Sequence, residues 1–210
     1  AELFTVSEQT SLMISKKGKG LLRSRAIATR EPVSLKHNQQ KQRPLTERPR
    51  PYLTSLGIAG QDGQILQNGR RKFRQINKYI ELISHLLREQ PLSKGARIVD
   101  MGYLTFGLYD YLVNETQLPI KMTGVELRPD LVKICNTIAE QNKFQGLEFI
   151  AGDIHQYQPD GGIDMLIALH ACDTATDEAI AKGIRAQAEL IIVAPCCHKQ
   201  VRKAMQPPVA

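Results

Sequence analysis

Apolar and polar residues follow two different periods in the second half of the chain. Five short, largely apolar runs have the length of strands and lie at residues 97–101, 122–127, 147–153, 163–170 and 188–195. Three intervening segments repeat apolar residues every three or four positions, at residues 104–114, 128–144 and 176–187. The fourth and fifth runs are nearly all apolar, as expected for strands covered on both faces. Strands alternating with helices predict an α/β fold with a Rossmann-like, doubly wound parallel sheet.

The first half of the chain lacks this alternation. Short apolar runs on either side of "KKGKG" (16–20) predict a small basic β-hairpin with glycine in the turn. Residues 30–53 are rich in Pro, Gln and Arg and have no apolar period, which predicts an extended linker or arm. Residues 70–87 repeat apolar side chains three or four apart and predict an amphipathic helix with a basic, polar opposite face.

These patterns predict three parts. A basic hairpin and linker occupies residues 1–50, a lead-in segment with the amphipathic helix occupies 51–96, and the Rossmann-like core occupies 97–210. Only 15 residues follow Pro195, the end of the fifth strand. Sheets of this class usually have more strands, so we expect the core to be incomplete at its carboxyl end.

Charge is distributed unevenly along the chain. Residues 1–78 contain 16 Lys and Arg against 5 Asp and Glu, whereas residues 79–210 contain 12 against 16. A basic front on a slightly acidic body is typical of a protein that contacts a polyanion, although it also suits an ordinary solvated surface. No apolar run approaches the roughly 18 residues of a membrane span, and no signal-peptide pattern opens the chain. With four cysteines and no disulfide pattern, we expect a cytoplasmic protein.

Each of the first three predicted strands ends in an acidic residue. Asp100 ends the first strand and is followed by Gly102, Glu126 ends the second, and Asp153 ends the third. Ligands bind sheets of this class at the carboxyl ends of the strands, near the switch in strand order. A carboxylate after the second strand suits a ribose diol, and one after the third suits the exocyclic amine of adenine.

At these residues the chain resembles the class I S-adenosylmethionine-dependent methyltransferases, over roughly residues 70–203. In that family the first strand runs into a loop of the form D-x-G-x-G-x-G, and the second-strand acid holds the cofactor ribose. The resemblance implies S-adenosylmethionine as cofactor, bound by Asp100, Gly102, Tyr103, Glu126, Asp153 and Leu169.

The expected glycine-rich loop is only half present. "VDMG" and "YLTF" resemble its two ends, with several residues expected between Gly102 and Tyr103. Either the loop is short, which would weaken cofactor binding, or its centre is missing from the sequence. We favour the second interpretation, because both flanks match.

Candidate acceptor-site residues follow the fourth and fifth strands. "ALHACDTATD" contains His170, Cys172 and Asp173, and "VAPCCHKQ" contains Cys197 and His198. The two clusters resemble a bacterial methyltransferase-like branch and, more distantly, eukaryotic tRNA ribose 2′-O-methyltransferases. From that resemblance we expect His170, Asp173, Cys197 and His198 to line the acceptor site.

The resemblance extends to the helix before the core, where "KFRQINKYIELI" is similar to bacterial members. It implies that Arg71, Lys72 and Gln75 contact the substrate or the cofactor. It also implies, weakly, that RNA (rRNA or tRNA) is the substrate, held by the basic front.

Structural interpretations and two other functions remain open. The cysteines could be buried packing residues, and Asp173 could cap a helix. The His and Cys residues could instead bind zinc, but the spacing of structural zinc sites is absent, so no metal is predicted. A degenerate, non-catalytic RNA-binding module is the other alternative.

Overall fold

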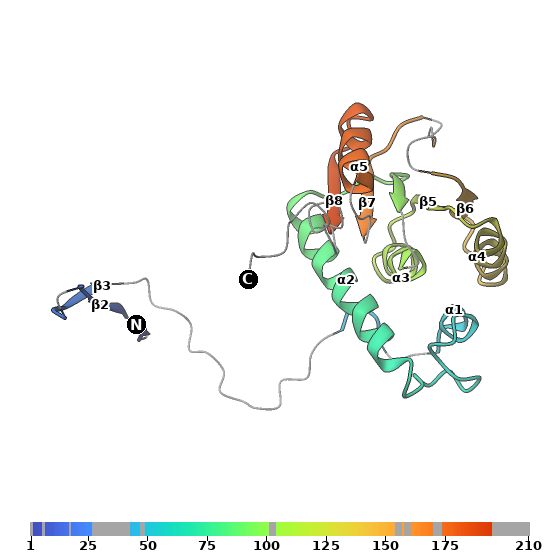
Figure 1. Ribbon diagram of the computed structural model, residues 1–210. Coiled ribbons are helices and arrows are strands. Elements are labelled where there is room, and N and C mark those ends of the chain that lie inside the picture. Colours follow the sequence, from blue (N-terminus) through green and yellow to red (C-terminus); the bar gives the residue numbers. More distant parts are fainter. Residues whose placement is uncertain are drawn as a thin grey trace, which may run out of the picture. The chain divides into compact units, whose positions relative to one another are not determined.

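The chain is described by a computed structural model over residues 2–5, 7–16, 18–26, 43–46, 49–100, 104–153, 157, 161–169 and 174–194. It divides into two units, residues 1–42 and 43–210 (Figure 1). None of the helices that these residues form has the length and apolar character that a membrane span needs.

The first unit contains the predicted hairpin. Strands β2 (Glu8–Ile14) and β3 (Gly20–Ala26) pair antiparallel, with Ile14 opposite Gly20. The turn between them contains Gly18, whose positive φ of 77° is easily adopted by glycine. A third strand, β1 (Glu2–Phe4), pairs with β2. The hairpin prediction is therefore confirmed, and the structure adds an outer strand too short to show a sequence pattern.

The five apolar runs of the second unit form one parallel sheet. Its strands are β4 (Arg97–Asp100), β5 (Lys121–Glu126), β6 (Leu147–Ala151), β7 (Met165–Leu169) and β8 (Leu190–Ala194). Their order is β6-β5-β4-β7-β8, and every pairing between neighbours is parallel. The chain leaves β4 towards β5 on one side and reaches β7 on the other, so the strand order switches beside β4. This confirms the predicted doubly wound, Rossmann-like sheet.

Helices cover both faces of the sheet, and successive residues of each strand therefore lie in two different cores. Ile98 packs in the larger core with α2 (Arg70–Glu89), α3 (Thr105–Asp110) and α4 (Pro129–Gln141). Val99 packs in the smaller core with Ala179 of α5 (Thr174–Arg185), which contacts β7 and β8 (Figure 1). Alternate residues pointing to opposite faces explain why these strands are apolar throughout.

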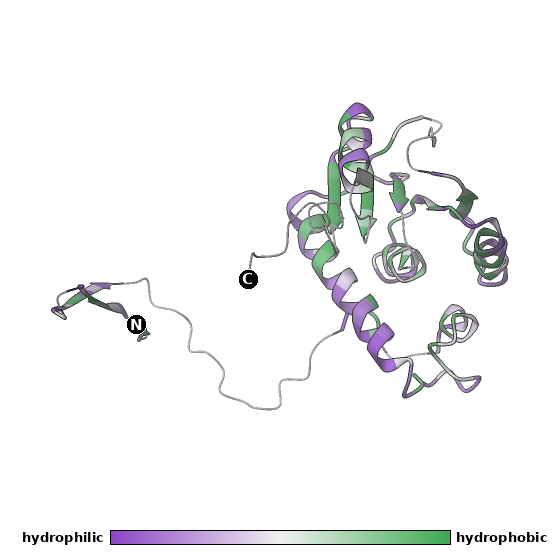
Figure 2. Ribbon diagram, viewed as in Figure 1, coloured by the Kyte–Doolittle hydropathy of each residue, from purple (hydrophilic) through white to green (hydrophobic). Residues whose placement is uncertain are grey.

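Helix α2 is the predicted amphipathic helix. Its apolar positions, including Phe73, Ile76, Ile80 and Ile83, are buried. Its first turns carry polar and basic residues, which appear purple in Figure 2. The apolar stripe of the helix therefore packs in the larger core beside α3, and the polar residues of its amino-terminal half are mostly exposed.

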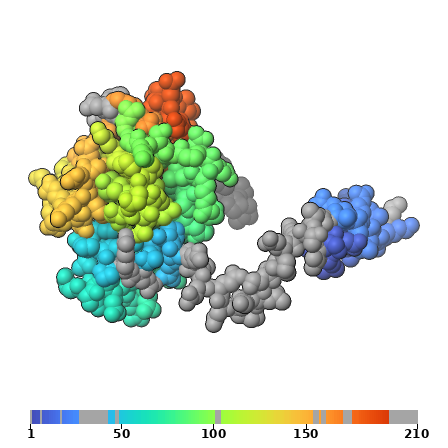
Figure 3. All heavy atoms as spheres, turned by 180° about the vertical axis from the view of Figure 1, so that it is seen from behind, coloured from blue at the N-terminus to red at the C-terminus, as the bar shows by residue number. Residues whose placement is uncertain are grey.

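The interpretation of residues 30–53 as an extended linker is wrong at its carboxyl end. Leu45, Tyr52 and Leu53 are at most 1 % exposed, and residues Pro51–Ser55 form helix α1. The atoms of this cyan segment adjoin the green and yellow body of the second unit in Figure 3. Segment 43–55 belongs to the fold because it buries apolar side chains that its proline-rich composition conceals.

A buried ionic cluster ties this segment to the core. The Arg50 guanidinium donates to Asp110 at the end of α3 and to Glu115, at 2.8 Å, in the following π-helix η1 (Tyr111–Glu115). The Tyr52 hydroxyl (3.2 Å) and the Asn114 amide (2.8 Å) also donate to Asp110. The side chains of Arg50 and Asp110 are only 3 % and 6 % exposed. We call these five residues the Arg50 cluster.

Candidate functional site

The candidate site lies where the strand order switches, at the carboxyl ends of β4, β5 and β6. Asp100 is the last residue of β4 and is paired in register with Gly124 of β5. Glu126 is the last residue of β5 and is paired with Ala151 of β6. The Gly152 amide then donates to the Glu126 carbonyl at 3.0 Å, and Asp153 follows directly. Three adjacent strand ends thus carry one carboxylate each.

Asp100 is fully buried and held by two hydroxyl groups. Its Oδ2 accepts hydrogen bonds from Thr105 Oγ1 at 2.9 Å and from the Tyr79 hydroxyl at 3.4 Å. Burial, followed by the charge of Asp100 and the hydrogen bond to it, raises the pKa of Tyr79 well above its usual value. Tyr79 therefore remains a hydrogen-bond donor and fixes the carboxylate between α2 and α3.

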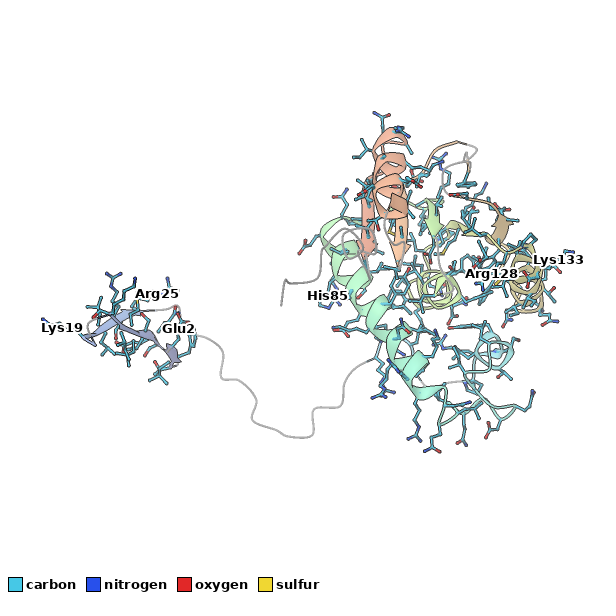
Figure 4. The ribbon with its side chains drawn as sticks, viewed as in Figure 1. Glu2, Lys19, Arg25, His85, Arg128 and Lys133 are labelled. Atoms are coloured by element: carbon cyan, nitrogen blue, oxygen red, sulfur yellow. The ribbon has the colours of Figure 1, made fainter. Side chains whose placement is uncertain are left out.

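Glu126 is partly exposed, and its carboxylate faces the beginning of α4. The Arg128 side chain donates to it through Nε at 3.0 Å and Nη2 at 3.3 Å, and the Arg128 amide donates at 3.2 Å. The side-chain hydrogen bond with Arg128 is the main cause of a lowered pKa at Glu126. Arg128 itself is exposed at the start of α4 (Figure 4), so this ion pair is screened by solvent. Glu126 stays ionised and can accept hydrogen bonds from a ligand.

Asp153 is half-buried and lies within electrostatic reach of Lys182 on α5. The Lys182 ammonium donates to the Tyr157 carbonyl and sits 5.9 Å from the centre of the Tyr157 ring. Burial, helped by the charge of Arg185, lowers the pKa of Lys182, while the charge of Asp153 opposes that shift. The Asp153 carboxylate is therefore within electrostatic reach of the Lys182 ammonium, which comes from α5 on the face of the sheet with the smaller core.

The remaining predicted residues are distributed unevenly. Leu169 ends β7 and is half-buried against the larger core. In the first two turns of α2, Arg71 and Gln75 are exposed and Lys72 is half-buried. The direct link from α2 to the strand ends is Tyr79, which the sequence analysis did not single out.

Several predicted site residues lie outside the described residues. They are Gly102 and Tyr103 of the glycine-rich loop and the acceptor-site candidates His170, Asp173, Cys197 and His198. Cys172 and Cys196, which the zinc alternative also needs, lie outside them as well. Cys135 is half-buried against the larger core, and burial followed by the charge of Glu126 raises the pKa of its thiol.

Two residues missed by sequence reasoning complete the observed site. Tyr79 and Thr105 are buried residues with a hydroxyl group, in α2 and at the first position of α3. A hydroxyl in such a position needs a hydrogen-bond partner. That requirement was the available signal, but the partner, Asp100, could not be named without the fold.

The donor and acceptor groups present fit an adenosine-containing cofactor. Glu126 offers two carboxylate oxygens at the end of the second strand, where ribose hydroxyls are bound in folds of this class. The described residues at the three strand ends are acidic, which suits a ligand that brings hydroxyl and amino donors and no phosphate. The site can therefore hold a nucleoside by accepting hydrogen bonds from the hydroxyl and amino groups of that nucleoside.

Comparison with known proteins agrees with this geometry. A family model described as a methyltransferase domain matches residues 71–204. No match to a curated protein was found. Among solved structures, an S-adenosylmethionine-dependent methyltransferase from Geobacter sulfurreducens in complex with S-adenosyl-L-homocysteine is 20 % identical, with a TM-score of 0.38, over 50 % of this chain and 43 % of that one.

A second similar structure is YjhP from E. coli, at 18 % identity and a TM-score of 0.37, over 47 % of this chain and 42 % of that one. The chain thus spans less than half the length of these two structures. The family match covers well over half of the chain and includes all five strands of the sheet. The chain belongs to the family of methyltransferase domains, as the sequence resemblance predicted.

Proposed function

We propose that this chain is the core of an S-adenosylmethionine-dependent methyltransferase that acts on RNA. The observation that carries the cofactor assignment is the placement of Asp100 and Glu126 at the ends of adjacent parallel strands beside the switch in strand order. Ligand sites of doubly wound sheets form at this position. The family match independently assigns the fold to methyl transfer.

The roles of the cofactor-side residues follow from their positions. Glu126 would accept hydrogen bonds from the ribose hydroxyls, and Asp153 from the exocyclic amine of adenine. Asp100, held by Thr105 and Tyr79, would position the start of the loop that contains Gly102 and Tyr103, and Leu169 would border the pocket from β7. When bound, the cofactor supplies an electrophilic methyl group.

The acceptor side would be built by the residues that follow β7 and β8. These strands are neighbours, and their last residues, Leu169 and Ala194, are register partners. His170 and Asp173 follow the first of these strands in the sequence, and Cys197 and His198 follow the second. We propose that this group orients the acceptor and that His170 accepts its proton as general base.

Replacing His170 tests the acceptor assignment. His170→Ala should lower kcat for methyl transfer by a larger factor than it weakens S-adenosylmethionine binding, because a general base acts on the acceptor rather than on the cofactor. Steady-state kinetics and calorimetric titration of the same preparation separate the two effects. His85, exposed on α2 (Figure 4), provides the control, and His85→Ala should change neither quantity. An unchanged kcat in His170→Ala would remove His170 from the mechanism.

RNA as substrate is supported by charge. The first 78 residues hold an excess of eleven positive charges, and α2 begins with Arg70, Arg71 and Lys72. The resemblance to bacterial members of the methyltransferase-like branch extends over this helix. Arg71, Lys72 and Gln75 are accordingly proposed as substrate contacts, together with the basic front of the chain.

Methyl incorporation tests the proposed substrate class. The full chain is incubated with tritium-methyl-labelled S-adenosylmethionine and, separately, total RNA or total protein from cells that lack the gene. We expect label in RNA, decreasing steeply between low and physiological salt, because each neutralised phosphate releases counterions. Label in protein alone would contradict RNA as substrate but not methyl transfer. Label in neither fraction, together with no cofactor binding by the full chain, would favour the non-catalytic module.

A further inference from the structure

A basic cavity opens beside the first turn of α2, away from the carboxylate cluster. Its volume is about 540 Å³, and it is lined by Arg43, Gln64, Ile65, Arg70, Phe73 and Arg74. The buried ring of Phe73 and the half-buried Ile65 supply apolar wall, and three guanidinium groups supply the charge. We call it the arginine cavity.

Two arginines of the cavity, Arg70 and Arg74, have no acidic partner within the described parts of the chain. None of the lining residues that the structure describes is acidic. Among the described residues, no carboxylate forms an ion pair with Arg70 or Arg74, and both side chains are exposed. The Arg74 Nε donates to the Arg70 carbonyl at 3.4 Å. This contact holds the Arg74 side chain back along the helix, towards its amino-terminal end.

The position of these arginines opposes helix stability. A helix macrodipole favours acidic residues in the first turn, yet α2 has none there and begins with Arg70, Arg71 and Lys72. Its N-cap, Gly69, provides no side-chain hydrogen bond. Arg70 and Arg74 are one turn apart, where like charges repel. Local choices that disfavour the element they occupy are expected at functional sites.

A bound anion would reverse each of these unfavourable effects. It would neutralise the like charges and interact favourably with the positive end of the helix macrodipole. Phosphate suits the cavity in particular, because guanidinium groups bind its oxygens through paired N–H donors. The ribbon of the first turns of α2 has the purple colour of hydrophilic residues in Figure 2.

We propose that the arginine cavity binds a backbone phosphate of the RNA strand whose acceptor nucleotide occupies the methyl-transfer site. This assignment rests on the proposed RNA substrate. Helix α2 connects the two places, since Tyr79 contacts Asp100 and Arg70 lies nine residues earlier, about 13 Å along the helix axis. A strand anchored at the cavity is therefore held on the helix that leads to the strand ends, and the cavity orients the substrate without touching the reacting atoms.

The test compares two double variants of the full chain. Arg70→Gln/Arg74→Gln removes two charges from the cavity while keeping side chains that suit a helix. Arg88→Gln/Lys133→Gln removes two exposed charges elsewhere, from the last turn of α2 and from α4, where Figure 4 labels Lys133. Fluorescence anisotropy with a fluorescein-labelled, single-stranded RNA of mixed sequence is measured across a salt series. Calorimetric titration with S-adenosylmethionine and thermal unfolding are measured in parallel.

We expect the cavity variant to bind RNA roughly tenfold more weakly than the control variant at low salt, and the slope of log affinity against log salt concentration to be smaller by about 0.7, the value for one lost phosphate contact. Cofactor affinity should not change. The midpoint of thermal unfolding should stay constant or rise, because two unfavourable charges leave the helix start. An unfolding midpoint below that of the unaltered chain would contradict the claim that these two charges oppose the stability of α2.

Failure of this assignment is distinguishable from failure of the proposed function. RNA binding by the unaltered chain, with equal affinities in the two double variants, overturns the cavity and leaves the RNA substrate intact. No RNA binding by the unaltered chain overturns both. Thermal unfolding with inorganic phosphate distinguishes a further outcome, in which phosphate raises the unfolding midpoint of the unaltered chain but not of the cavity variant, while the two proteins bind RNA equally well. In that case the cavity binds a small phosphate compound, and the RNA assignment is wrong.

Discussion

Replacing Asp110 by alanine is expected to lower the free energy of unfolding by about 3–5 kcal/mol, because it leaves the Arg50 guanidinium buried beside a single remaining partner. Arg50 and Asp110 are almost inaccessible to solvent, and Glu115, which would remain, is 27 % exposed. Tyr52 and Asn114 would lose an acceptor at the same time. The loss exceeds that of an exposed ion pair, which contributes at most about 1 kcal/mol.

Urea unfolding of Asp110→Ala measures this effect. Asp130→Ala is the matched control, because Asp130 is exposed in the first turn of α4 and should cost no more than about 1 kcal/mol. The double variant Arg50→Met/Asp110→Leu should recover much of the loss, since apolar side chains of suitable volume often replace a buried ion pair. A loss below about 1 kcal/mol in Asp110→Ala would mean that the Arg50 cluster does not hold segment 43–55 in place.

The same cluster connects stability to function. Asp110 ends α3, and Thr105 at the beginning of α3 donates to Asp100 at the candidate site. The Arg50 cluster therefore holds the end of α3, the helix whose first residue positions the Asp100 carboxylate. Partial loosening of the Arg50 cluster is expected to weaken cofactor binding even in molecules that remain folded.

Sequence patterns predicted the sheet and its helices because those patterns are local. Strands buried on both faces are apolar throughout, and α2 shows its packing stripe every three or four residues. Segment 43–55 was missed for a physical reason. Its stability comes from Leu45 and Tyr52 inserted in the core and from Arg50 paired with acids about sixty residues away. Contacts over that separation leave no periodic signal.

The candidate site was predictable only in part. An acid at the end of each of the first three strands of the sheet is visible in the sequence, and Asp100 and Glu126 close apolar runs. Their hydrogen-bond partners were not, since Tyr79 reaches Asp100 from a helix that precedes the strand by many residues. The arginine cavity was missed as well. The family resemblance pointed to Arg71, Lys72 and Gln75 on the same helix. Arg70 and Arg74 line the cavity because they lie on one face of α2, and only the fold shows what that face adjoins.

Replacing Glu126 by alanine is expected to weaken S-adenosylmethionine binding roughly 100-fold, or by about 3 kcal/mol, because hydrogen bonds to a charged acceptor contribute about 1.5–3 kcal/mol each. Two ribose hydroxyls would lose that acceptor together. The fold should not be affected. Glu126 is partly exposed, and Arg128, its partner, is exposed enough to be solvated by water after the change.

Glu140 provides the matched control for this variant. It is an exposed glutamate on α4, the helix that Arg128 precedes, and Glu140→Ala should leave cofactor affinity within twofold of the unaltered chain. Thermal unfolding of both variants shows whether either one disturbs the fold. Equal unfolding midpoints assign any difference in affinity to the site itself.

Calorimetric titration of the full chain with S-adenosylmethionine is the most direct test of the site at the strand ends. The account predicts saturable binding by the unaltered chain and by Glu140→Ala, and a roughly 100-fold weaker affinity in Glu126→Ala. Equal affinities in all three proteins would contradict it, because the ribose would then be held somewhere other than at the end of β5.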